Sequence, residues 1–164
     1  MTTLKRIGFV AILCVLTSLS MNNETKAQSV GANSAVYLEL GGNGLLYSLN
    51  YDYRFDKDWS ARGGIMYAPV GDVSLTIVPL MANYLIGSNH NFEIGAGIAY
   101  LGVSVDVEGE DFAGISASGV AGTSTIGYRY QNMDGGFVFR IGLTPVFGEF
   151  GVLPWAGLSL GYAF

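Results

Sequence analysis

The stretch LLYSLNYDYRF, residues Leu45–Phe55, decides the fold, because apolar and polar residues alternate along it. Successive side chains of a β-strand point to opposite faces of the sheet. One face is then wholly apolar and carries Leu45, Tyr47, Leu49, Tyr51, Tyr53 and Phe55. The other face is largely polar and carries Leu46, Ser48, Asn50, Asp52 and Arg54. A helix would repeat its apolar positions about every three to four residues, so the stretch predicts a β-strand.

The same two-residue alternation continues along the chain and predicts further strands. We expect eight of them, at residues 35–42, 45–55, 59–69, 74–86, 92–106, 119–131, 137–147 and 155–164. Compact connections rich in Asp, Asn and Gly alternate with connections that are more variable and on average longer. This asymmetry is typical of outer-membrane barrels, which have short periplasmic turns and longer extracellular loops.

Composition separates a membrane barrel from a soluble one. Charged residues make up 13% of the chain, against about 25% in typical soluble domains. Beyond the N-terminal segment, no apolar run approaches the ~20 residues of a membrane-spanning helix. Aromatic residues of the apolar face gather near one predicted rim, as in the girdle at lipid headgroups. We therefore predict an all-β fold, an eight-stranded antiparallel up-and-down transmembrane β-barrel over residues 35–164. A lipocalin-like soluble barrel is the alternative.

The N-terminal segment has the pattern of a secretory signal peptide. Lys5 and Arg6 precede an apolar run that is too short to span a membrane and leads into a polar stretch. We expect a signal peptide over residues 1–27 and a short periplasmic lead-in over residues 28–34, with cleavage after Ser20 as the alternative. The exported chain then contains no cysteine and forms no disulfide.

The end of the chain carries the most specific motif, Leu158-x-Leu160-x-Tyr162-x-Phe164. With this motif, the alternating strands and the aromatic rim, the chain resembles the small, porin-like outer-membrane barrels of Gram-negative bacteria, of the OmpA, OmpX and OmpW kind. In that group the terminal aromatic residue is the assembly signal read by the barrel-assembly machinery. The resemblance implies the outer membrane as the location, with membrane lipids and that machinery as partners. We expect a monomer.

Charged residues on the inward face of the predicted strands are the first candidate site. Three acids and four arginines nearly cancel, and arginine can pair bidentately with carboxylates. The candidates are Glu39, Asp52, Arg54, Arg62, Glu93, Arg129 and Arg140. We interpret them as a structural ion network that fills a narrow lumen, with a gate or a narrow ion path as the alternative.

A second candidate is an acidic stretch in a predicted extracellular loop, with Asp106, Glu108, Glu110 and Asp111. Clustered carboxylates attract divalent cations. Their spacing matches no calcium-binding loop, so a solvated loop tip is the other interpretation.

Other signals narrow the function further. The only histidine, His90, falls in a predicted periplasmic turn, and no Ser–His–Asp arrangement can be assembled on the outer side. After residue 27 the chain has five basic residues against twelve acidic ones, which disfavours nucleic-acid binding. We expect no enzyme, cofactor or metal site, and a structural or surface-interaction role. Inward apolar residues of the fourth strand, such as Ile77 and Met81, leave open a carrier or narrow channel for a small hydrophobic ligand.

Overall fold

Strands make up nearly all of the ordered elements. The structure is a computed structural model that describes residues 31–105, 115–149 and 151–164. The strands are β1 (Ser34–Gly41), β2 (Tyr47–Arg54), β3 (Trp59–Val70), β4 (Val73–Gly87), β5 (His90–Val105), β6 (Ile115–Gln131), β7 (Gly136–Leu143), β8 (Val146–Gly148), β9 (Gly151–Leu153) and β10 (Ala156–Ala163). A short 3-10 turn, η1 (Gly42–Gly44), joins β1 to β2. No helix among the described residues is long and apolar enough to cross a membrane.

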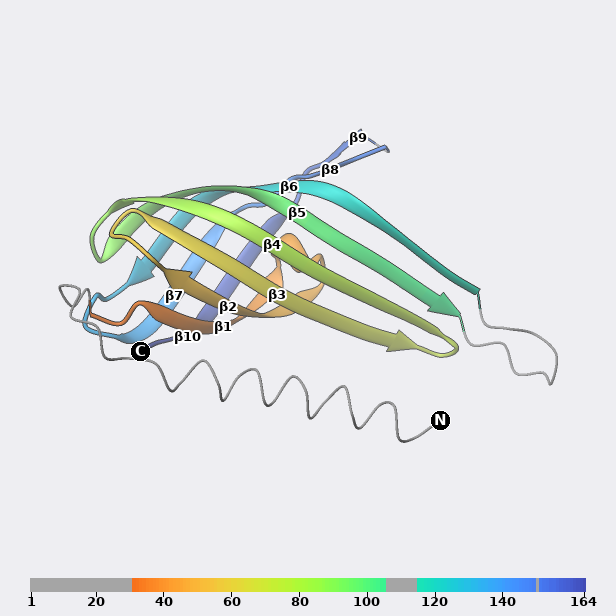
Figure 1. Cartoon of the computed structure of the whole chain (residues 1–164), viewed down its shortest axis with the longest axis horizontal. Coiled ribbons are helices and arrows are strands. Elements are labelled where there is room, and N and C mark those ends of the chain that lie inside the picture. Colours follow the sequence, from red (N-terminus) through yellow and green to blue (C-terminus); the bar gives the residue numbers. More distant parts are fainter. Residues whose placement is uncertain (1–30, 106–114, 150) are drawn as a thin grey trace.

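The sheet closes on itself to form a barrel (Figure 1). Consecutive strands pair antiparallel from β1 to β7, and β10 lies between β7 and β1. The segment β8 resumes the course of β7 after Thr144–Pro145, and β10 resumes that of β9 after Pro154–Trp155. When each interrupted pair is taken as one strand, the barrel has eight strands. The predicted eight-stranded antiparallel barrel is therefore confirmed.

The strand boundaries differ from the predicted ones in three places. The segment β2 begins at Tyr47, because Leu45 adopts a φ of 66° and leaves the strand conformation. Leu45 packs inward, while Leu46, which the alternation placed inward, is exposed. β6 begins at residue 115, before the predicted start at 119. The predicted strand at 137–147 is interrupted once, and an additional segment, β9, precedes the last strand where the sequence predicted a loop.

The two faces of the barrel wall have opposite polarity. Outward side chains are apolar and exposed, as for Leu49 at 55% and Phe137 at 55%. Inward side chains are largely polar and buried, as for Asp52 and Arg129, both at 0%. A barrel in water has the reverse arrangement, with its apolar side chains inside. The outside of this barrel therefore suits contact with lipid.

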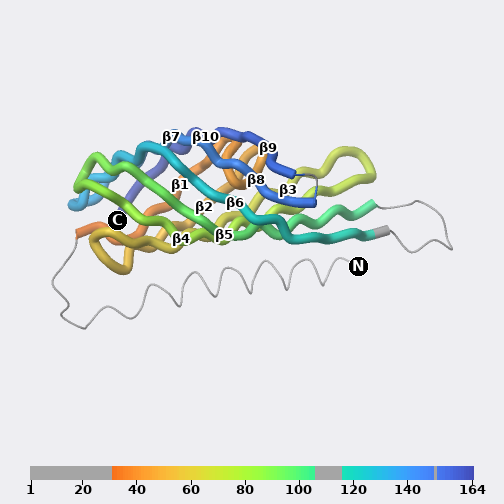
Figure 2. The backbone as a smooth tube through the Cα atoms, turned by 90° about the horizontal axis from the view of Figure 1, so that it is seen from above, coloured from red at the N-terminus to blue at the C-terminus, as the bar shows by residue number. Residues whose placement is uncertain are grey.

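The two ends of the barrel are built differently. Short turns at residues 55–58, 88–89 and 132–135 lie at one end, which we call the turn end. The hairpins β3–β4, β5–β6 and β8–β9 lie at the other, which we call the hairpin end. There β3–β4 and β5–β6 reach well beyond β1 and β2, so the rim is uneven (Figure 2). Ser34 and Phe164 exchange backbone hydrogen bonds at the turn end.

The interior is mostly polar and contains two apolar clusters. Near the turn end, Ala35, Tyr37, Val138 and Ala163 form a small buried cluster. Polar and charged side chains lie beside it and fill the middle of the lumen, since Asp52 is opposite Ala35 in the strand register. Toward the hairpin end a second apolar cluster forms around Met66, Ile77 and Ala99, and partly buried neighbours pack against it. These neighbours are Leu45, Ala68, Leu75 and Leu101.

Candidate functional site

Six charged side chains meet in the middle of the lumen, each from a different strand among β1, β2, β3, β5, β6 and β7. The register explains their meeting, because residues opposite each other on neighbouring strands lie side by side. Asp52 lies opposite Arg62, and Arg129 lies opposite Arg140. Arginines and carboxylates alternate through the group, which we call the ion chain. Its order is Arg62, Glu39, Arg140, Glu93, Arg129 and Asp52.

Two pairs of the ion chain are bidentate. Arg129 donates to both carboxylate oxygens of Asp52, over 2.7 Å and 3.1 Å. Arg140 donates from Nε and Nη2 to the two oxygens of Glu93, each over 2.9 Å. Such fork-shaped pairing fixes both side chains in one orientation. The four side chains therefore form two ion pairs of fixed geometry.

Single contacts link the two bidentate pairs to each other and to the pair formed by Arg62 and Glu39. Arg62 pairs with Glu39 over 3.0 Å, and Arg140 approaches the same carboxylate at 3.5 Å. Arg129 lies 3.8 Å from Glu93. Side chains of the ion chain are at most 4% exposed. Three arginines and three acids balance, so the buried group carries no formal net charge.

Neutral side chains supply further hydrogen-bond partners to the ion chain. Arg140 donates to the Tyr37 hydroxyl over 2.9 Å, and its guanidinium lies 4.8 Å from the centre of that ring. Ser60 donates to Asp52 over 3.2 Å. Arg129 also donates to Gln131, two residues along the strand, over a short contact. These bonds compensate part of the cost of burying charge.

Arg54, the seventh predicted member, stands apart from the ion chain. Its side chain lies near the turn end and donates to the Lys57 carbonyl over 2.7 Å and to the Met133 sulfur at 3.2 Å. It pairs with no carboxylate among the residues that the structure describes. The structure thus brings six of the seven predicted charges together and leaves one outside the group.

Asn43 is a central residue that the sequence did not single out. The η1 turn folds into the lumen, so that Asn43 is fully buried. Its amide nitrogen donates to the Thr123 hydroxyl over 2.6 Å, and its oxygen accepts from Thr125 over 3.1 Å and from Arg62. Its backbone N–H donates to Glu39 over 3.2 Å. The signal was Gly41-Gly-Asn-Gly44, which predicts a turn but not the direction in which the turn folds.

The glycine before Asn43 is required by both conformation and space. Gly42 has a φ of 68°, in the left-handed region. A Cβ atom there would lie 2.1 Å from the Glu39 carboxyl carbon. A larger residue would therefore push the η1 turn away from the ion chain.

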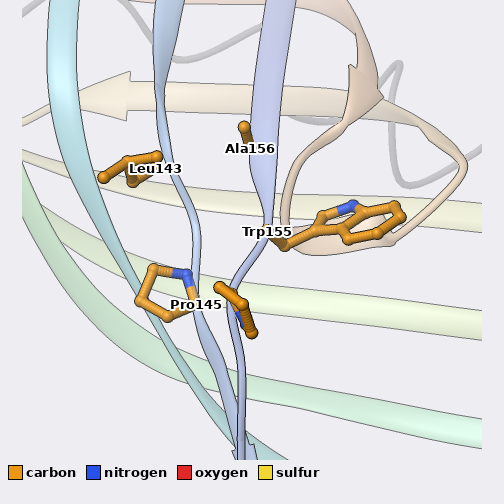
Figure 3. Close-up of a pocket in the computed structure, with 5 residues that line it drawn as sticks. Leu143, Pro145, Trp155 and Ala156 are labelled. Carbon is orange, nitrogen blue, oxygen red and sulfur yellow. The ribbon is translucent and has the colours of Figure 1, made fainter.

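The interior apolar residues form a packed cluster, not an open pocket. Met66 and Ile77 are fully buried, and Leu75 packs against them. A small cavity of about 10 Å³ lies beside Glu39, Glu93 and Arg140, which is room for roughly one water molecule. The larger hollow, about 520 Å³, lies on the outward face near the breaks in the last strands (Figure 3).

The remaining candidates fall in four places. His90 is exposed at the turn end, where Nδ1 lies 2.6 Å from the Tyr128 hydroxyl. The side chains of the terminal motif point outward and are exposed; they are Leu158, Leu160, Tyr162 and Phe164. The acidic loop residues lie outside the described residues; they are Asp106, Glu108, Glu110 and Asp111. The expected signal peptide, residues 1–27, also lies outside them.

Comparisons with known proteins support the fold. No protein-family model matches the chain, and no curated protein matches it. The N-terminal β-barrel domain of Pseudomonas aeruginosa OprF superposes with a TM-score of 0.62 at 20% identity, over 82% of this chain and 99% of that one. Ail, the attachment invasion locus protein of Yersinia pestis, superposes with a TM-score of 0.51 at 17% identity, over 80% and 95%. At these identities the likeness shows a shared small-barrel fold.

Proposed function

We propose that the chain is an integral outer-membrane β-barrel with a filled lumen and a structural or surface-interaction role. The observation that carries this proposal is the inverted polarity of the wall, with exposed leucines and aromatics outside and the ion chain inside. A closed barrel leaves no unpaired edge along its membrane-spanning part, as a lipid environment demands. Export through the inner membrane, with removal of residues 1–27, is part of the proposal.

The packing of the interior supports a filled lumen. Two apolar clusters share the lumen with the ion chain, one around Tyr37 and Val138 and the other around Met66 and Ile77. The η1 turn adds backbone to the same space, since Asn43 is fully buried. An eight-stranded barrel is just wide enough for side chains to fill it. The same packing disfavours a carrier for a hydrophobic ligand, because the interior apolar residues already contact one another.

The surface-interaction part of the proposal rests on the hairpin end. There β3–β4 and β5–β6 project beyond the rest of the wall (Figure 2). Ail, which shares the fold, is by its name an attachment and invasion protein. For this chain we propose only that the hairpin end contacts molecules outside the cell, without naming a partner.

Two measurements test the proposal. The protein, refolded into phospholipid vesicles, should migrate as a heat-modifiable band on gels, because a closed barrel resists detergent until it is boiled. In planar bilayers it should give no large, stable channel openings. Large openings would contradict the filled lumen while leaving the barrel intact. Absence of both the band shift and membrane insertion would contradict the membrane barrel itself.

A further inference from the structure

The barrel wall is interrupted on two adjacent strands at the same level. One break is Thr144–Pro145, between β7 and β8, and the other is Pro154–Trp155, between β9 and β10. Proline has no backbone N–H, so neither proline can donate a hydrogen bond across the strands. Thr144 N–H still donates to the Trp155 carbonyl over 2.8 Å. The Pro145 carbonyl also accepts from the Ser124 N–H over 3.1 Å, so the wall stays closed here although the two prolines supply no donor.

An apolar hollow lies at this double break on the outward face. Its volume is about 520 Å³, and it is lined by Leu143, Pro145, Pro154, Trp155 and Ala156 (Figure 3). The one polar group among these side chains, the indole N–H of Trp155, already donates to the Leu45 carbonyl over 2.8 Å. The volume lies within the range of about 300–1,000 Å³ that is usual for small-molecule sites. The lining therefore suits an occupant that offers hydrocarbon and no polar groups.

The position of the hollow along the barrel indicates where such an occupant comes from. Ala156 lies eight residues before Phe164 at the turn end. At about 3.3 Å per residue and a tilt of about 40°, this places the hollow roughly 20 Å along an apolar band of ~25 Å. The hollow is thus near the upper edge of the band, where tryptophan side chains sit at headgroup level. Exposed Leu143 and Leu158 continue the lipid-facing surface into it.

We propose that this hollow binds one acyl chain of a lipid in the leaflet at the hairpin end. The inference rests on the proposed membrane location, because the surface that leads into the hollow is the one that faces lipid. An acyl chain seated there restores the dispersion contacts that the interrupted wall does not supply. Trp155 lies beside the upper part of the chain, and the two prolines form the walls.

The two tryptophans of the chain allow a matched test. Trp155 lines the hollow, and Trp59 faces outward at the turn end with similar exposure, 38% against 45%. In Trp59→Phe and Trp155→Phe variants, each tryptophan is observed alone in detergent micelles to which a limiting amount of phosphatidylcholine is added. The added lipid carries bromine near the carbonyl end of its acyl chains, where it quenches a tryptophan that it contacts.

We expect Trp155 to be quenched about twofold more than Trp59 at roughly one brominated lipid per protein, because the hollow recruits the scarce lipid while Trp59 meets it only at random. In the Trp59→Phe background, Ala156→Phe fills the hollow and should lower the quenching to the level of Trp59. A heat-modifiable band shows that each variant is folded.

Three outcomes would overturn the inference. Equal quenching of the two tryptophans would contradict acyl-chain binding in the hollow without contradicting the membrane barrel. Equal quenching together with dimers cross-linked through Ala156→Cys would show that a second copy covers the hollow. No quenching of either tryptophan, without a heat-modifiable band, would refute the proposed membrane barrel as well.

Discussion

Arg140 contacts four other polar side chains of the lumen. It pairs bidentately with Glu93 and approaches Glu39 at 3.5 Å, and it donates to the hydroxyls of Tyr37 and Ser159. Because arginine presents several donors in a fixed planar arrangement, a lysine could not reproduce all of these bonds. Arg54 is a useful contrast at this scale, since it is also an inward, buried arginine but lies outside the ion chain.

Arg140→Met should lower the free energy of unfolding by about 3–5 kcal/mol, because it leaves the buried Glu93 without its main partner. The measurement is urea unfolding of the protein in detergent or vesicles, followed by tryptophan fluorescence. Arg54→Met is the matched control and should cost clearly less, since no carboxylate of the ion chain loses a partner. The double variant Arg140→Met with Glu93→Gln should recover part of the loss. Equal losses for the two arginines would contradict the ion chain as a stabilising unit.

How well the residues of the site could be predicted depends on their periodicity. Inward charges such as Asp52 and Arg129 follow the two-residue alternation, so sequence alone placed them on the lumen face. The alternation does not predict that Arg54 lies outside the ion chain, because it gives the face of each residue and not its position along the barrel axis. It also missed Asn43, whose partner Thr123 is 80 residues away.

The elements that the sequence predicted correctly have local causes, and those that it missed depend on tertiary contacts. The strands β2 to β6 follow the alternation closely, since one wholly apolar face fixes both their type and their orientation. The break at Pro145 was missed because this residue fits the outward row of the pattern, and β9 was missed because its residues and Pro154 were assigned to a loop. The η1 turn folds inward because lumen partners satisfy its polar groups, and no local signal encodes those partners.

Asn43→Ala should destabilise the barrel by about 1–3 kcal/mol, because buried groups that bonded its side chain lose a partner. Urea unfolding under the conditions used for the arginine variants measures the effect. Ser74→Ala, in the β3–β4 hairpin, is the control and should be nearly silent. If the two variants are equally stable, then η1 is not anchored through this side chain.

At the scale of the whole molecule, the barrel combines an apolar exterior with an interior filled by the ion chain and two apolar clusters. One cluster lies beside the ion chain near the turn end, where Ala35 is opposite Asp52, and the other lies toward the hairpin end. The aromatic side chains at the turn end face outward, including Phe55, Phe137 and Phe164. This arrangement predicts that outward residues matter for entry into the membrane, and inward residues for stability afterwards.

Phe164→Ala should reduce the amount of folded barrel recovered from outer membranes of expressing cells, because it removes the proposed assembly signal. The purified variant, refolded into vesicles, should have nearly unchanged stability. Phe55→Ala is the matched control, since Phe55 is an outward aromatic at the same end with similar exposure, 58% against 61%. The readout is the ratio of heat-modifiable to unfolded band in membrane fractions. Equal recovery of the two variants would contradict a signalling role for the terminal residue.

The ion chain draws its six charges from six different strands, and this has a consequence for how the barrel is made. A slip of one residue in the pairing of any of these strands turns its inward side chains outward. The slipped strand would then present its charge to hydrocarbon, at a cost of up to about 2–4 kcal/mol for an arginine at mid-bilayer. It would also leave its former partner unpaired inside. The charges thus favour the correct register during assembly. A slipped strand raises the free energy in both of these ways, whereas the correct register neutralises every charge of the ion chain.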